Sequence, residues 1–189
     1  MRTAYERSWP GALTGTTHIS VLDEAGAAVG LSSTLGSGSG VFRGGTQLNN
    51  MLGELDVIGP GERVPGERLP SMMTPTLVLE SGRPRLVIGS AGSVRLAGAI
   101  AQVTWRILHG VHVAAAIEAP RLHVEGSTLH LEGGWADEAV DRLGSGWDVV
   151  RWEGLNLFFG GVQAVERFAD GTLAAVGDPR RGGAGVVVS

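Results

Sequence analysis

The stretch GTTHISVL, residues 15–22, opens the first regular element of the chain and indicates a β-hairpin. Apolar and polar residues alternate over residues 18–22, and β-branched and apolar residues recur in a second run at residues 28–32. Between the two runs stands Asp23-Glu24-Ala25-Gly26, which supplies turn chemistry. Two alternating runs joined by a turn are typical of paired strands. We therefore predict a hairpin formed by these two segments.

Outward from this hairpin, the chain reads as strands, then helices, then more strands, which is a layered α/β (α+β) pattern. A second hairpin is predicted at residues 76–80 and 85–89, and its apolar strands are expected to be covered on both faces. Helical spacing and breakers predict helices at residues 93–109, 113–118 and 136–143. Residues 58–70, rich in Gly, Pro and charge, are expected to form an irregular surface loop. Further strands are expected at residues 121–124, 129–131, 148–152, 161–167 and 173–176.

Composition bounds the function. The chain has 189 residues, which fits one domain, and all 15 basic residues are Arg, so catalysis by Lys is excluded. It has no Cys, which removes thiol nucleophiles and thiolate metal sites. A net charge of −4 argues against nucleic acid as a partner. No signal peptide or membrane-spanning run is visible in the sequence, which leaves the cellular compartment undecided. The five His residues lack the spacing of metal ligands, and we expect neither a metal nor a cofactor.

A single glycine motif is weak evidence for a functional site. Residues 36–40 (GSGSG) could hold an anion through main-chain N–H groups, but a flexible turn is the simpler interpretation. Gly92-Ser93 alone would indicate a helix cap, and Gly15-Thr16 alone an ordinary strand entry. A lone strand residue such as His18 is more often packed or hydrogen-bonded in a core than a catalytic base.

An ordered set of segments is more specific than any one of them. Together they resemble the small subunit of the gamma-glutamyltransferases, which belong to the N-terminal nucleophile hydrolase superfamily. The agreement in order and spacing runs from about residue 16 to residue 183. The matching segments are TTHISV (16–21), ST (33–34), LNN (48–50), residues 68–76 with SMMTPT, GSAGS (89–93), APRLH (119–123) and DPRRGG (178–183).

The resemblance implies a fold and a mechanism. The fold would be the small-subunit half of a four-layer αββα sandwich with stacked antiparallel sheets. Thr16 would be the nucleophile, with its own α-amino group as base after cleavage of the Gly15–Thr16 bond. Thr34 would hydrogen-bond and orient the nucleophile. Main-chain N–H groups of Gly92 and Ser93 would form the oxyanion hole, where the family has two glycines.

Departures from the family pattern lie in the positions that bind the substrate. Gly36 stands where the family commonly has Asn, and Met51 where it has Gln or Glu. Glu54 takes the place of the Asp that binds the substrate α-amino group. Of a Ser-Ser pair for the α-carboxylate, Ser71 is kept and Met72 replaces the second. Glutathione itself is therefore a doubtful substrate, because each lost bond to a charged group is worth about 1.5–3 kcal/mol.

The resemblance also implies a division of the chain and a partner. Residues 1–15 would be the tail of a large subunit or propeptide, and residues 16–189 the small-subunit domain. The large subunit, from the same precursor or encoded separately, would complete the sheets and supply an Arg to the substrate. The chain would then be a fragment, a split gene product or a truncated form.

Three functions are compatible with the sequence. The first is hydrolysis or transfer of γ-glutamyl amides, such as glutathione or its conjugates, through an ester on Thr16. The second is acylase activity on a different acyl group, which Met51 and Met72 suggest. The third is a non-catalytic partner subunit that never matures.

Overall fold

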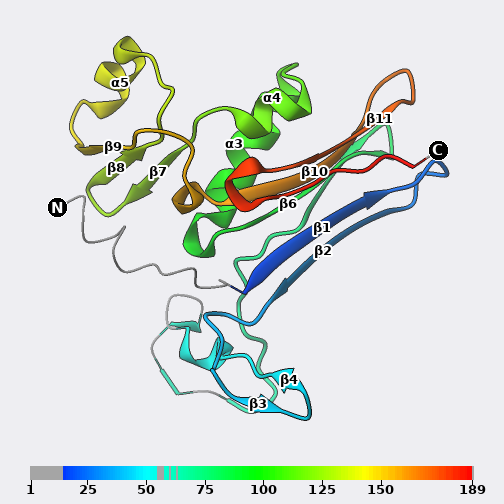
Figure 1. The fold of residues 1–189 in the computed structure, drawn as a ribbon, viewed down its shortest axis with the longest axis vertical. Coiled ribbons are helices and arrows are strands. Elements are labelled where there is room, and N and C mark those ends of the chain that lie inside the picture. The colour runs from blue at the N-terminus through cyan, green and yellow to red at the C-terminus, as the bar shows by residue number, and fades with distance from the viewer. Residues whose placement is uncertain (1–14, 55–57, 60, 63, 189) are drawn as a thin grey trace. The chain divides into compact units, whose positions relative to one another are not determined.

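Residues 15–54, 58–59, 61–62 and 64–188 are described by the computed structural model of the chain (Figure 1). They divide into two compact units. Unit 1 contains residues 15–16 and 33–70, and unit 2 contains residues 17–32 and 71–188. Of the predicted segment 1–15, only Gly15 lies among the described residues. Residues 60 and 63 of the predicted loop at 58–70, and residues 55–57 just before it, also lie outside the described residues.

Unit 2 is built on a four-stranded antiparallel sheet in the order β11-β10-β6-β5. The central strand β6 is apolar on both faces, and Leu86, Val87 and Ile88 are fully buried. Strand β5 was expected to be central as well, and this was wrong. It is an edge strand, so Leu77 and Leu79 remain 49% and 59% exposed. The strands are β5 (Thr76–Glu80), β6 (Arg83–Ala91), β10 (Gly161–Arg167) and β11 (Leu173–Gly177).

One face of this sheet is covered by helices α3 (Leu96–Leu108) and α4 (Val113–Glu118), as Figure 1 shows. Residues of β6 alternate between the two faces. Leu86 and Ile88 therefore join the helices in the main core, together with Val103 of α3. The helix expected over 93–109 starts differently: a 3-10 turn, η2 (Ser93–Arg95), precedes α3. The helix predicted at 113–118 is confirmed as α4.

The other face of the sheet is covered by the hairpin predicted at residues 18–22 and 28–32. Its strands are β1 (Thr16–Leu22) and β2 (Ala28–Thr34). Leu22 packs with Val87 of β6 and Val165 of β10. The His18 ring lies so close to the Cα of Gly89 that a Cβ there would overlap it. Unit 2 therefore stacks helices, a four-stranded sheet and a hairpin, as expected for an α+β fold with stacked antiparallel sheets.

A smaller sheet completes unit 2, in the order β7-β8-β9, with β7 antiparallel and β9 parallel to β8. Its core contains Leu129 and Leu131 of β8 and Val140 of α5. The described residues of unit 1 include two short strands and one 3-10 turn. The remaining elements are β7 (Leu122–Glu125), β8 (Thr128–Leu131), α5 (Asp137–Gly144), β9 (Asp148–Arg151), η3 (Leu157–Phe159), η4 (Pro179–Arg181), and in unit 1 β3 (Phe42–Arg43), β4 (Thr46–Gln47) and η1 (Met51–Gly53).

A buried network of four charged side chains joins distant parts of unit 2. Arg121 donates from Nη2 to Oδ2 of Asp178 at 2.6 Å, and Arg180 donates to Oε2 of Glu132 at 2.6 Å. Arg180 also reaches Oδ1 of Asp178 at 3.2 Å. The two segments APRLH and DPRRGG thus meet, and the contacts assign them a structural role.

His18 is a buried core residue, as the sequence suggested. Its Nδ1 lies 2.7 Å from Ser32 Oγ, and its Nε2 lies 3.0 Å from Ser20 Oγ. Ser20 donates its hydroxyl proton to the carbonyl of Gln163. The Nε2 atom must then donate to Ser20, and in the neutral ring Nδ1 accepts from Ser32, so both ring nitrogens are paired.

Burial lowers the pKa of His18 below its usual value. The unfolded chain then binds more protons than the folded chain as the pH falls through about 6.5, so the free energy of unfolding decreases there. We expect His18→Asn to flatten the pH dependence of unfolding between about pH 7 and pH 5. Urea unfolding at a series of pH values measures the free energy of unfolding, and His109→Asn, at an exposed histidine, is the control. An equal change of this free energy with pH in both variants would contradict the expectation.

No helix in the described ranges is long and apolar enough to cross a bilayer.

Candidate active site

The residue pair Thr16 and Thr34 is brought together by the hairpin. Thr16 begins β1 and Thr34 ends β2, and their hydroxyl oxygens lie 2.9 Å apart. The Gly36 N–H donates to Thr34 Oγ1 at 3.0 Å, which fixes the position of that hydroxyl. The contact places the Thr34 hydroxyl where it can orient Thr16, the residue predicted from the sequence as the nucleophile.

The peptide bond between Gly15 and Thr16 is held by the same turn. The Leu35 N–H donates to the Gly15 carbonyl oxygen at 3.0 Å. A Cβ on Gly15 would lie 3.0 Å from the Gly36 carbonyl oxygen and 3.1 Å from Leu35 Cβ. Any larger residue at position 15 would therefore press against the turn that carries Thr34.

Glu54 is anchored in unit 1 by Ser37. Its Oε1 accepts the Ser37 N–H at 2.8 Å and the Ser37 hydroxyl at 2.7 Å. The Ser37 hydroxyl, followed by its N–H, lowers the pKa of the Glu54 carboxyl, which keeps it ionised. An anionic carboxylate held in this way is suited to an ammonium group.

Gly36 is required by the space around it. Its φ is +64°, and a Cβ there would lie 2.9 Å from Glu54 Oε1 and still closer to Asn50 Oδ1. The Asn50 Oδ1 in turn accepts the Gly38 N–H at 3.1 Å. An Asn at position 36, as in the family pattern, would displace these groups. Ser37 and Asn50 were not predicted as site residues, although both belong to segments already singled out, GSGSG and LNN.

The remaining predicted binding residues fall in different units. Met51 lies half-buried in η1 of unit 1. In unit 2, Ser71 is exposed and its Oγ accepts the Met73 N–H at 3.3 Å, while Met72 beside it is half-buried.

Gly92 and Ser93 form a sharp turn where β6 leads into η2, of which Ser93 is the first residue, in unit 2. Ser93 has φ of +55°, a left-handed conformation that is costly for a residue with a Cβ, on the order of 1–3 kcal/mol. Gly92 has φ of +151°, and a Cβ there would lie 2.7 Å from Gly160 Cα. The Gly160 carbonyl accepts a hydrogen bond from Arg121 at 3.0 Å. The buried charge network therefore holds the loop against which Gly92 packs.

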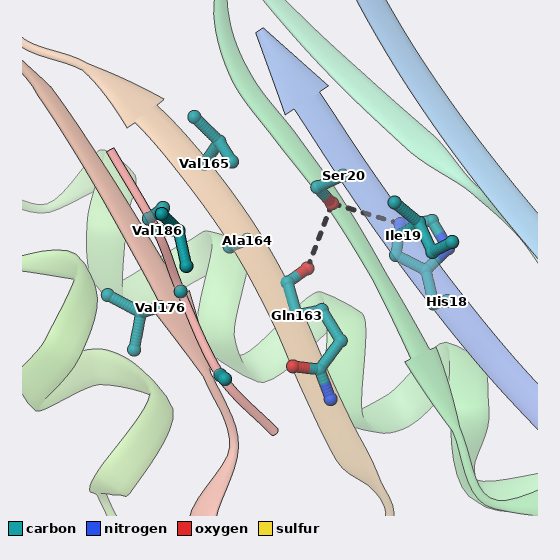
Figure 2. Close-up of a pocket in the computed structure, with 11 residues that line it drawn as sticks. His18, Ile19, Ser20, Gln163, Ala164, Val165, Val176 and Val186 are labelled. Atoms are coloured by element: carbon teal, nitrogen blue, oxygen red, sulfur yellow. Dashed lines mark hydrogen bonds between the residues drawn. The ribbon is translucent and has the colours of Figure 1, made fainter. Parts of the chain in front are cut away.

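A separate pocket of about 180 Å³ lies in unit 2, between the hairpin strand β1 and strands β10 and β11 (Figure 2). The Ser20 hydroxyl projects between His18 and the Gln163 carbonyl in this pocket, as Figure 2 shows. None of the predicted site residues lines it. Among the described residues no group of three or more side chains has the arrangement of a metal site.

The comparison with known proteins shows the family to which the chain belongs. The family model described as Gamma-glutamyltranspeptidase matches residues 2–188. The chain belongs to the gamma-glutamyltranspeptidase family. Among its relatives, the glutathione hydrolase proenzyme of Escherichia coli (strain K12) is 33% identical, over 87% of this chain and 31% of that protein. The acylase ACY 1 proenzyme of Pseudomonas sp. (strain SE83) is 30% identical, over 97% of this chain and 35% of that protein.

The fold of this gamma-glutamyltranspeptidase family member also matches a solved structure. A gamma-glutamyltranspeptidase chain from Pseudomonas nitroreducens, complexed with L-DON, has a TM-score of 0.78 and 28% identity, covering 92% of this chain and 100% of that chain. The resemblance of the sequence to this family is thereby confirmed. The chain spans about a third of the length of the curated relatives it matches.

Proposed function

We propose that this chain supplies the nucleophilic threonine of an amide hydrolase or acyltransferase that acts on γ-glutamyl amides. The observation that carries the proposal is the 2.9 Å contact between the Thr16 and Thr34 hydroxyls, in a chain that matches the family over residues 2–188. Cleavage after Gly15 would free the α-amine of Thr16. An α-amine has a pKa of about 7.7–8.0, so a useful fraction is neutral and can act as base near pH 7.

In the turnover reaction, Thr16 Oγ1 would attack the substrate carbonyl and release the amine, leaving an ester on Thr16. Water or an acceptor amine would then resolve the ester. Thr34 would hold the nucleophile, and the N–H groups of Gly92 and Ser93 would donate to the oxyanion. Glu54 would bind the substrate ammonium, and Ser71 its carboxylate. No cofactor is needed for any of these steps.

A large-subunit partner forms part of the proposal. Relatives with the same domain are described as proenzymes. In unit 2, Ile19, Val21, Val29 and Leu31 of the hairpin are each 50–56% exposed. A contiguous apolar face of this kind marks an interaction surface.

The test is to assemble the chain with its partner subunit and to follow a chromogenic γ-glutamyl amide. We expect release of the chromophore together with a new chain that starts at Thr16. Cleavage without release of the chromophore would favour an acylase with a different acyl group. A chain that stays uncut in the assembly would favour a non-catalytic subunit.

The acyl-group alternative is favoured by particular residues. Met51 and Met72 replace polar side chains of the family pattern, and Gly36 has no room for the family Asn. A polar side chain that could bind the substrate is therefore missing at positions 36, 51 and 72. If γ-glutamyl amides are the substrates, their binding should be weak in the unmodified assembly.

This leads to a prediction on specificity. We expect Met51→Gln combined with Met72→Ser to raise kcat/KM for a free γ-glutamyl amide, by at most the value of two restored bonds, about 3–6 kcal/mol. Glu54→Ala should lower kcat/KM by about 10- to 100-fold, corresponding to one lost bond to a charged group. Met51→Ala is the matched control and should change it little. A silent Glu54→Ala would refute the assignment of the ammonium site.

A further inference from the structure

The uncleaved Gly15–Thr16 bond has a hydrogen-bond donor already in place on its carbonyl oxygen. The donor is the main-chain N–H of Leu35, at 3.0 Å. Gly15, Thr16 and Leu35 all belong to unit 1, and each is partly buried. This N–H plays no part in the turnover reaction described above.

We propose that the Leu35 N–H is the oxyanion donor of the self-cleavage step, and that it differs from the donors used in turnover. The proposal rests on the proposed function, since it needs Thr16 to attack the bond that precedes it. It adds a second oxyanion site to the chain, built from the residue between Thr34 and Gly36.

The step can be written in full. Thr16 Oγ1 attacks the Gly15 carbonyl carbon, and the carbonyl oxygen takes the negative charge in the tetrahedral intermediate. The C–N bond then breaks, and the hydroxyl proton ends on the Thr16 nitrogen, which becomes the free amine. Gly15 is left as an ester on Thr16 Oγ1, and one water hydrolyses it to a Gly15 carboxylate and the free hydroxyl.

The Leu35 N–H suits this intermediate because it already points at the atom that gains charge. A hydrogen bond to an anionic oxygen is about twice as strong as one to a neutral carbonyl. The bond therefore strengthens in the transition state, which is the requirement for catalysis. Preorganisation adds to the effect, since the Leu35 carbonyl is itself fixed by the Asn50 and Gly38 N–H groups, at 3.1 and 3.2 Å.

The neighbouring main-chain N–H has a separate task. The Gly36 N–H donates to Thr34 Oγ1, which contacts the attacking Thr16 hydroxyl. Two consecutive N–H groups thus serve the two reacting atoms, one directly and one through Thr34. Gly15 fits this arrangement, because a Cβ would press on Leu35 Cβ at 3.1 Å and loosen the contact.

The test replaces the amide N–H of Leu35 by an ester oxygen, by translating the full chain in vitro with the α-hydroxy analogue of leucine at position 35. The chain is assembled with its partner, and intact mass follows the appearance of the fragment that begins at Thr16. The matched control carries the same ester at Leu31, a leucine of strand β2, which ends at Thr34, one residue before Leu35. Spontaneous hydrolysis of either ester gives a different mass and is counted separately.

We expect the Leu35 ester to slow self-cleavage roughly 10²–10³-fold relative to the Leu31 ester, as for the loss of one oxyanion donor. Rates within threefold of each other would overturn the proposal. If the unmodified chain does not cleave in the assembly, the proposed function itself fails, which is a distinct outcome.

A second measurement does not depend on the folding of the ester chain. In the Thr16→Ala chain, which cannot cleave, labelling of Leu35 with ¹⁵N and of the Gly15 carbonyl with ¹³C allows the coupling across the hydrogen bond to be measured by NMR. A measurable coupling is expected. Its absence in the folded chain would refute the proposal.

Discussion

Thr16→Ala is expected to abolish both self-cleavage and turnover. The side chain of Thr16 is the proposed nucleophile in both reactions, and the Thr34 hydroxyl, 2.9 Å from it, is proposed only to orient it. Loss of a catalytic nucleophile lowers kcat by about 10⁴–10⁶-fold. Chromophore release from a γ-glutamyl amide by the assembled protein measures turnover, and intact mass measures cleavage.

Thr16→Ser is the matched variant, because it keeps the hydroxyl and removes only a methyl group. We expect it to cleave and turn over, at a reduced rate. The neighbouring Thr17→Ala controls for the loss of a threonine side chain in the same strand, and it should behave like the unmodified chain. Turnover by an uncut Thr16→Ala protein would remove Thr16 from its role.

Asp178→Ala is expected to be the most destabilising substitution in unit 2. The Asp178 carboxylate accepts hydrogen bonds from Arg121, from Arg180 and from the Val162 N–H, and it is fully buried. Its removal leaves the buried Arg121 guanidinium without its carboxylate. Breaking a buried ion pair in this way costs about 3–5 kcal/mol. Urea unfolding followed by tryptophan fluorescence measures the free energy of unfolding.

The surface ion pair between Asp137 and Arg151 supplies the control. Its distance of 2.8 Å is similar, but the side chains are 82% and 54% exposed. Asp137→Ala should therefore cost at most about 1 kcal/mol. Equal losses for the two variants would show that the buried network adds nothing beyond a surface pair.

Much of the fold could be predicted because local pattern and tertiary packing agree. The hairpin of β1 and β2, helix α4 and strand β10 follow from alternation, helical spacing and breakers alone. Strand β5 could not be placed from its local pattern, because Leu77 and Leu79 are as apolar as the residues of β6. Its edge position follows from the strand order, in which β6 pairs on its other side with β10, a strand far along the chain.

The candidate site was predictable to the extent that it consists of side chains in family motifs. Thr16 and Thr34 lie together because Thr16 begins β1 and Thr34 ends β2 of the hairpin, and a hairpin of these two segments was predicted from the sequence. The roles of Leu35 and Gly36 depend on main-chain N–H groups, which every residue but proline carries, so side-chain identity gives no signal for them. Ser37 and Asn50 were missed for a different reason: their contacts join positions 12 to 17 residues apart across an irregular segment.

The turn at Ser93 shows a third limit. The sequence placed Gly92 and Ser93 at the start of a helix, where N–H groups are unpaired. The structure places a 3-10 turn there, with Ser93 left-handed at φ +55°. Either arrangement keeps the main-chain N–H groups that we propose as oxyanion donors, but only the 3-10 turn places a strained residue at that point.

The most direct test of the account is the intact mass of the chain in its assembly, before and after brief exposure to a γ-glutamyl amide. The account predicts two masses that correspond to residues 1–15 and 16–189, and a transient γ-glutamyl adduct carried only by the second. A chain of 189 residues that remains whole while the amide is turned over would contradict it.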